Sequence, residues 1–252
     1  MAVVTIEISE EAGVRSLHFG SDWVQGAMRI ARPFALELEY TREMMAALLL
    51  RPQLDWPRRA LLIGLGAGSL AKFLWRYRPQ ARVTVVEINP AVIPAARQYF
   101  KLPNDPARLH IEVGDGADFV ARSTATFDLI MVDGFDANAR PGQLDSSAFY
   151  LNCRARLSDQ GMLSTNLLSR RKDYRVSLQR IDEAFEGRAL SFPSCGSGNA
   201  VAFAATGETV KMTTAELKTA ALALKADTGL NLLPTLVRLE QARTCRDGAL
   251  VL

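Results

Sequence analysis

The chain has 252 residues, of which 48% are hydrophobic and 23% charged, with a formal net charge of +3. These proportions are typical of a globular protein, and a chain of this length buries a core without disulfides or a structural metal. Lysine and arginine are scattered, and their densest run, 170–172, is interpreted as a solvated loop, so we expect no nucleic-acid partner.

The sequence also argues against a membrane or secreted protein. No apolar run approaches the length of a bilayer span, and the N-terminus lacks the basic and apolar regions of a signal peptide. The three cysteines, Cys153, Cys195 and Cys245, cannot all pair, and none stands in a C-x-x-C motif. Reduced thiols in a cytoplasmic protein fit this pattern best.

Residues 1–56 predict a small N-terminal unit of β-strands followed by a connecting helix. Alternating polar and apolar residues predict strands at 3–9, 14–20 and 22–30. From 34 to 50 the apolar residues recur at helical spacing. The polar segment 51–57 contains two prolines, so we place the domain boundary there, with a second domain over 57–252.

The second domain alternates between short apolar strands and helical patterns. The predicted strands are 59–66, 81–88, 109–115, 127–133, 161–168, 187–194 and 198–207. Helices between the first six imply a mostly parallel α/β sheet, Rossmann-like and covered on both faces. Only a short turn separates the last two strands, so the last strand of this seven-stranded sheet should be antiparallel. One or two terminal helices within 213–242 are expected to pack on this body.

Three glycines lie directly between the first strand of this domain and its helix. Gly64, Gly66 and Gly68 permit a tight turn and let a ligand approach the backbone near the helix N-terminus. The spacing is G-x-G-x-G, and Ser69 stands where a dinucleotide fingerprint has its third glycine. A plain turn would use the same residues, but the shorter loop suits an adenosyl ligand without a pyrophosphate.

Acidic residues close the next three strands. Glu87 ends the second strand, where a carboxylate can accept both hydroxyls of a ribose, and Asp115 ends the third, where it can accept from an adenine amine. Asp133 ends the fourth strand and Asp136 follows it, ahead of the long polar segment 137–147. One acid capping the next segment and one solvated acid would be the structural alternative. His18 and His110 have no cysteine or acid cluster around them in the sequence, so no metal is expected.

Four stretches together, LLIGLGAGSL, VVEINP, VGDGADF and FDLIMVDGFD, resemble the spermidine synthases, or polyamine aminopropyltransferases. The resemblance runs from about Gln25 to Ala205. It implies the S-adenosylmethionine-dependent methyltransferase fold and transfer of an aminopropyl group from decarboxylated S-adenosylmethionine to a small polycationic amine such as putrescine. It also implies a homodimer, although the N-terminal β-region is shorter than is usual in the family.

The resemblance also implies a role for each site residue. On the donor side, Glu87 would hold the ribose, Ile88 would pack on the adenine, Gln25 would lie near the nucleoside, and Asp115 with the backbone of Gly116 and Ala117 would read the adenine edge. Asp133 takes the place of the catalytic aspartate, and Asp136 that of an acid that grips the diamine. The segment 137–147 corresponds to a gate loop.

Three positions depart from the family pattern. Ala67 replaces the acid that holds the donor amine in the family's glycine loop, and Phe192 replaces a tyrosine that assists the acceptor. The motif Y-Q-E-M appears as Y-T-R-E-M, which displaces Tyr40 by one residue, and it is still expected near the amine. A methyltransferase that uses ordinary S-adenosylmethionine, and a nucleoside-binding protein without catalysis, therefore stay open beside the leading aminopropyltransferase hypothesis.

Overall fold

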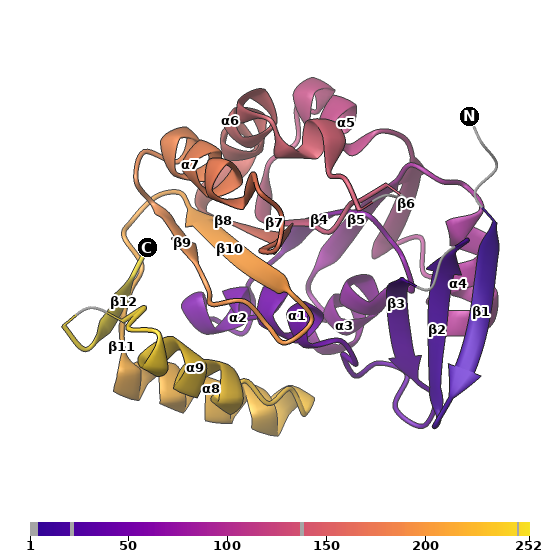
Figure 1. Ribbon diagram of the computed structural model, residues 1–252, viewed down its shortest axis with the longest axis horizontal. Helices are drawn as coiled ribbons and strands as arrows, with labels where there is room; N and C mark the ends of the chain where they lie inside the picture. Colours follow the sequence, from indigo (N-terminus) through magenta and orange to yellow (C-terminus); the bar gives the residue numbers. More distant parts are fainter. Residues whose placement is uncertain (1–4, 21–22, 137–138, 246) are drawn as a thin grey trace.

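The computed structural model describes residues 5–252, apart from 21–22, 137–138 and 246. Figure 1 shows a small N-terminal sheet at one side, a large central sheet with helices above and below it, and a C-terminal helix pair at the opposite end. The N-terminal sheet is antiparallel and consists of β1 (Ile6–Glu11), β2 (Val14–Phe19) and β3 (Val24–Arg29).

The connecting helix is shorter than the sequence predicts. Two short helices, α1 (Glu39–Met44) and α2 (Ala47–Leu50), take the place of one helix over 34–50. The prediction was wrong for residues 34–38, because hydrogen bonds from Arg32 N to Arg29 O and from Ala35 N to Arg32 O close turns just before α1. The apolar residues of the segment 34–50 therefore enter the core partly from irregular backbone and partly from the two short helices.

The central sheet confirms the predicted seven strands. They are β4 (Arg59–Ile63), β5 (Arg82–Glu87), β6 (Leu109–Val113), β7 (Phe127–Val132), β8 (Leu157–Leu168), β9 (Ala189–Ser191) and β10 (Asn199–Ala205). Their spatial order is β6-β5-β4-β7-β8-β10-β9, parallel from β6 to β8. The last strand, β10, runs antiparallel to both of its neighbours, as expected. Strand order reverses between β4 and β7, which is where open α/β sheets bind ligands.

Helices cover both faces of this sheet (Figure 1). They are α3 (Ser69–Tyr77), α4 (Val92–Phe100), α5 (Gly116–Arg122), α6 (Ser147–Ala155) and α7 (Tyr174–Ala184), with a 3₁₀ turn, η1 (Gly142–Asp145). Successive residues of β4 point to opposite faces of the sheet and belong to two separate hydrophobic cores. Leu62 packs with α3 and α4, whereas Leu61 and Ile63 pack with α5, α6 and α7. The apolar runs of the parallel strands are thus explained by burial on both faces.

The C-terminal region holds the two predicted helices, α8 (Thr214–Thr228) and α9 (Leu233–Gln241). A short pair of strands, β11 (Lys211–Thr213) and β12 (Ala249–Val251), brackets them and was not predicted. Thr213 and Glu216 form a capping box that starts α8. In the described part of the chain, no helix combines the length and apolar character that a membrane span requires.

Candidate active site

The predicted site residues gather along one edge of the central sheet, at the carboxyl ends of four parallel strands. Register pairs Ile63 of β4 with Val86 of β5 and Val132 of β7, so the residues that follow these strands emerge side by side. Glu87 pairs with Val113 of β6, which brings the segment before Asp115 to the same edge. Side chains from distant parts of the sequence are therefore neighbours here.

Two glycines of the loop after β4 are required by close backbone contacts. Gly64 has a φ of +94°, and a Cβ there would collide with the carbonyl group of Asp133. Gly66 has a φ of +49°, and a Cβ there would lie 2.9 Å from the carbonyl oxygen of Gln25. The loop is thus pressed between the end of β7 and the N-terminal sheet, which places the backbone of Gln25 beside it. Gly68 follows as the N-cap of α3.

Glu87 is only 6% exposed, and its carboxylate accepts a hydrogen bond from the backbone of the glycine loop. Its Oε2 accepts from the backbone N of Leu65 at 2.8 Å, and its Oε1 accepts from the backbone N of Asn89 at 2.8 Å. Burial raises the pKa of Glu87, and these backbone donors oppose the rise. The backbone N–H groups of Leu65, Gly66, Ile88 and Asn89 all act on this carboxylate, so ribose hydroxyls would share its acceptor positions with them. The neighbouring Ile88 is 64% exposed, as an apolar platform for a ring would be.

Asp115 is the N-cap of α5. Its Oδ1 accepts from the backbone N of Ala117 at 2.7 Å and of Asp118 at 3.1 Å, which stabilises the first turn. Gly116 is buried, and a Cβ added there would collide with a methyl carbon of Ile63, so only glycine fits. The backbone N–H of Ala117, expected at the adenine edge, is thus already used by the cap.

Asp133 is held by hydrogen bonds from two sides. The hydroxyl of Tyr40 donates to Oδ2 at 3.1 Å, and Nδ2 of Asn166 donates to Oδ1 at 2.8 Å. Burial raises the pKa of the Asp133 carboxyl, while both donors act to lower it. The pKa of Tyr40 is raised well above its ordinary value, first by burial and then by the charge of Asp133, so its hydroxyl stays a donor. The displaced tyrosine of the sequence motif therefore does reach Asp133, the aspartate that is predicted to be catalytic.

Two asparagines of this network were missed by the sequence reasoning. Asn199, on β10, donates through Nδ2 to Oδ1 of Asn166 at 2.9 Å, and Ser197 donates to Oδ1 of Asn199 at 2.8 Å. These hydrogen bonds orient the side-chain amide of Asn166 so that its NH₂ group faces Asp133. The available signal was an amide side chain near the carboxyl end of the predicted strand 161–168, and Asn166 is indeed buried on β8.

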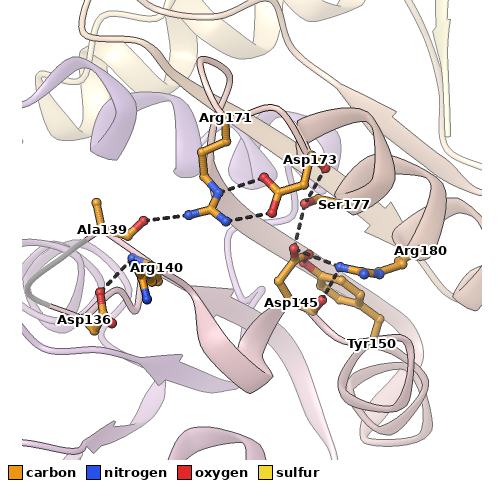
Figure 2. Close-up of polar contacts among 9 residues, drawn as sticks. All are labelled: Asp136, Ala139, Arg140, Asp145, Tyr150, Arg171, Asp173, Ser177 and Arg180. Atoms are coloured by element: carbon orange, nitrogen blue, oxygen red, sulfur yellow. Dashed lines mark hydrogen bonds and ion pairs between the residues drawn. The ribbon is translucent and has the colours of Figure 1, made fainter.

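Asp136 lies on the exposed turn after β7. Its backbone N donates to Arg140 O at 2.9 Å, and its Oδ1 accepts from Arg140 N at 2.8 Å (Figure 2). The predicted gate segment 137–147 begins with 137–138, which fall outside the described residues. Its far end is anchored by Asp145, whose carboxylate accepts from Tyr150, Ser177 and Arg180 at 3.0, 2.8 and 3.1 Å (Figure 2).

Two of the three departures from the family pattern, Ala67 and Phe192, are packed into the core. Ala67 is 2% exposed, and a Cβ added to Gly26 would lie 2.7 Å from its methyl group, so the N-terminal sheet fills the space of the family's acid. Phe192 is 3% exposed and packs against Phe203 in a tilted arrangement, with ring centroids 4.8 Å apart. Neither side chain offers a polar contact to a substrate.

Glu39, Glu43 and Cys195 form an acid–thiol cluster whose ligand atoms lie within 4.8 Å of one another. Arg238 forms an ion pair with each of the two acids. Its Nη1 lies 2.8 Å from Oε1 of Glu39, and its Nη2 pairs with Oε1 of Glu43. A guanidinium in this position neutralises the carboxylates that a metal ion would need. The absence of a functional metal stays a prediction.

Comparison with known proteins identifies the family. The sequence profile of the spermine/spermidine synthase domain matches residues 38–186. The polyamine aminopropyltransferase of Chromobacterium violaceum is 40% identical over 203 residues, covering 81% of this chain and 77% of that protein. An eEF1A lysine and N-terminal methyltransferase homolog of Drosophila melanogaster is 32% identical over 157 residues, covering 58% of this chain and 21% of its own.

Solved structures share the fold. A probable spermidine synthase from Corynebacterium glutamicum superposes with a TM-score of 0.71 at 22% identity, covering 89% of this chain and 85% of that chain. Human methyltransferase-like protein 13, in complex with SAH, gives a TM-score of 0.68 at 24% identity, covering 77% of this chain and 93% of that chain. These likenesses confirm the methyltransferase-type fold expected from the sequence. The domain match and the 40% identical relatives show that the chain belongs to the spermine/spermidine synthase family.

Proposed function

We propose that this protein transfers the aminopropyl group of decarboxylated S-adenosylmethionine to a polyamine-type amine, putrescine or a similar diamine, and releases methylthioadenosine. The observation that carries the proposal is the carboxylate of Asp133, held between Tyr40 and Asn166 beside a glycine loop, in a chain of this family. Relatives that are 40% identical carry the name polyamine aminopropyltransferase, which supports the same reaction.

The acceptor must lose a proton before it can react. An alkylamine has a pKa of about 10.4, so in water at neutral pH it is an ammonium without a lone pair. The Asp133 carboxylate attracts this cation, orients it and takes or relays the proton. The freed lone pair attacks the carbon of the aminopropyl chain that is bonded to the sulfonium sulfur, and the bond between that carbon and the sulfur breaks. The bonding electrons pass to sulfur, which leaves as a neutral thioether.

The donor side is assigned to the neighbouring strand ends. Glu87 holds the ribose hydroxyls while it also fixes the glycine loop, and Ile88 packs on the adenine. Asp115 and the backbone of Gly116 face the adenine edge, whereas the N–H of Ala117 is committed to the cap of α5. Since Tyr40 and the backbone of Gln25 come from residues 1–56, the proposed N-terminal domain completes a site that belongs mainly to residues 57–252.

A methyltransferase reaction with ordinary S-adenosylmethionine is the second candidate. The buried methyl group of Ala67 favours it, because the family's acid, absent here, would both hold the donor amine and repel a donor carboxylate. Methyltransferase relatives and neighbours are consistent with either reaction, since both use the same fold.

One experiment separates the candidates. The purified protein is incubated with each donor and a panel of amines, and methylthioadenosine and S-adenosylhomocysteine are quantified. Aminopropyl transfer predicts methylthioadenosine, formed only with the decarboxylated donor and only when an amine is present. Release of S-adenosylhomocysteine alone would establish the methyltransferase, and release of neither product with any amine would reject both.

A further inference from the structure

The turn that carries Asp136 is tied to the other side of the site by one arginine. Arg171 lies in the connection between β8 and α7, and its Nη1 donates to the carbonyl oxygen of Ala139 at 3.2 Å (Figure 2). The backbone N of Ala139 in turn donates to Asp136 O at 2.9 Å. A short chain of hydrogen bonds thus leads from the guanidinium to the proposed acceptor-binding acid.

The guanidinium itself is fixed by a bidentate ion pair. Its Nε donates to Oδ1 of Asp173 at 2.9 Å and its Nη2 donates to Oδ2 at 2.7 Å, while Asp173 is the N-cap residue of α7 (Figure 2). A planar fork on a carboxylate leaves little rotational freedom, and a lysine could not reproduce it. The remaining donor, Nη1, therefore approaches the carbonyl oxygen of Ala139 from a defined direction. Asp136 also lies within electrostatic reach, because its charge helps to raise the pKa of Arg171, after the larger effects of Asp173 and of Asp145.

We propose that Arg171 is a positioning residue for Asp136 and thereby a determinant of preference for diamines over monoamines. The inference rests on the proposed aminopropyl transfer and specifies its acceptor as an amine with a second, distal ammonium group. Asp136 is exposed on a surface turn that it shares with Arg140, and a turn that moved freely would lose conformational entropy on binding a cation. Arg171 holds that turn at a fixed distance from Asp133 before the acceptor arrives.

The test compares two amines in the same assay. Formation of aminopropylated 1,4-diaminobutane is followed with decarboxylated S-adenosylmethionine as donor, which gives KM and kcat for the diamine. The inhibition constant of 1-aminobutane, which lacks the distal ammonium, is measured from the same product, whether or not the monoamine itself reacts. The ratio of the two constants reports on the distal group alone.

Four variants share this assay. Arg171→Met is expected to raise the KM of the diamine about tenfold relative to the inhibition constant of 1-aminobutane, as for one weakened charge-assisted contact. Arg171→Lys and Asp173→Asn are expected to shift the ratio in the same direction, because each removes the fork. Arg170→Met is the matched control: it loses the same charge one residue away and should change the ratio by less than about twofold.

Three outcomes would overturn the inference about Arg171. They are an unchanged ratio in Arg171→Met, an equal change in Arg170→Met, and a full rescue by Arg171→Lys. Asp173→Asn provides the same comparison should Arg171→Met fail to fold. A wild-type protein that forms no aminopropylated product from any diamine would instead reject the proposed function itself, so the two failures are distinguishable.

Discussion

Asp133 experiences opposing influences on its proton affinity. Burial raises the pKa of its carboxyl, and the hydrogen bonds from Asn166 and Tyr40 counteract part of the rise. A carboxylate of raised pKa is a stronger base but is ionised over a narrower pH range. In the proposed reaction, the two donors therefore help to set the pH at which Asp133 can first accept a proton from an ammonium.

Replacing Asn166 with leucine should shift the pH dependence of the reaction. Without the Nδ2 donor, the pKa of Asp133 rises further, so the ionised fraction falls at any given pH. We expect the acidic limb of kcat/KM to move to higher pH by about one unit, equivalent to ~1.4 kcal/mol. Steady-state rates between pH 5 and 9 would measure it, with the exposed Asn104→Leu as control. An acidic limb at the wild-type position would contradict this role.

The residues that could be predicted from the sequence are those whose place follows from local order. Glu87, Asp115 and Asp133 each lie at or just after the end of a recognisable strand, and parallel strands bring their carboxyl ends together. Asn166 and Asn199 could not be found in this way, because only the antiparallel pairing of β8 with β10 makes them neighbours. Nothing in either local sequence indicates which strand will lie alongside.

Helix α1, which carries Tyr40, is supported by the C-terminal helix α9. Glu43 of α1 is fully buried and pairs with Arg238, and Thr235 donates to its Oε1 at 3.3 Å. Arg238 also donates to Oε1 of Glu39 at 2.8 Å. An element outside the matched domain 38–186 thus fixes a helix that reaches the site.

Arg238→Met should destabilise the protein strongly, because it leaves the buried carboxylate of Glu43 without its counter-charge. Breaking such a pair from one side costs about 3–5 kcal/mol. Urea unfolding would measure the loss, and the double variant Arg238→Met/Glu43→Gln should recover a large part of it. A loss below about 1 kcal/mol, the range of exposed ion pairs, would show that the pair contributes little.

Lys72 gives helix α3 a pH-dependent contribution to stability. It is 1% exposed, its Nζ donates to Phe100 O at 2.6 Å, and burial lowers its pKa to about 7. The unfolded chain, with a lysine pKa of about 10.4, binds more protons between pH 7 and 10 than the folded one. Stability contributed through Lys72 therefore rises with pH over this range and is lost as pH falls towards 7.

Lys72→Met should remove this dependence. Unfolding free energies at pH 7 and 9.5 are expected to show a rise for the wild type, relative to the variant, of about 1.4 kcal/mol for each unit of pKa separation titrated. Lys218→Met, on the exposed face of α8, serves as the control and should keep the wild-type slope. Equal slopes for the wild type and Lys72→Met would mean that Lys72 is charged in the folded protein.

At the scale of the whole molecule, the site is assembled from segments far apart in the chain. Tyr40 comes from the N-terminal part, the glycine loop and Asp133 from the central sheet, and Arg238 supports α1 from the C-terminal end. The sheet was predictable because strand and helix periodicities alternate along residues 57–207. The pairing of β11 with β12 and the docking of α9 on α1 were not, because each joins residues with no shared local pattern.

The most direct test of the account is the substitution Asp133→Asn. It keeps the size of the side chain but removes the carboxylate that the proposal requires to bind the ammonium and accept its proton. We expect kcat for aminopropyl transfer to fall by about 10³-fold or more, while the Kd for methylthioadenosine changes by less than about threefold. Turnover within about tenfold of the wild type would contradict the central role of Asp133.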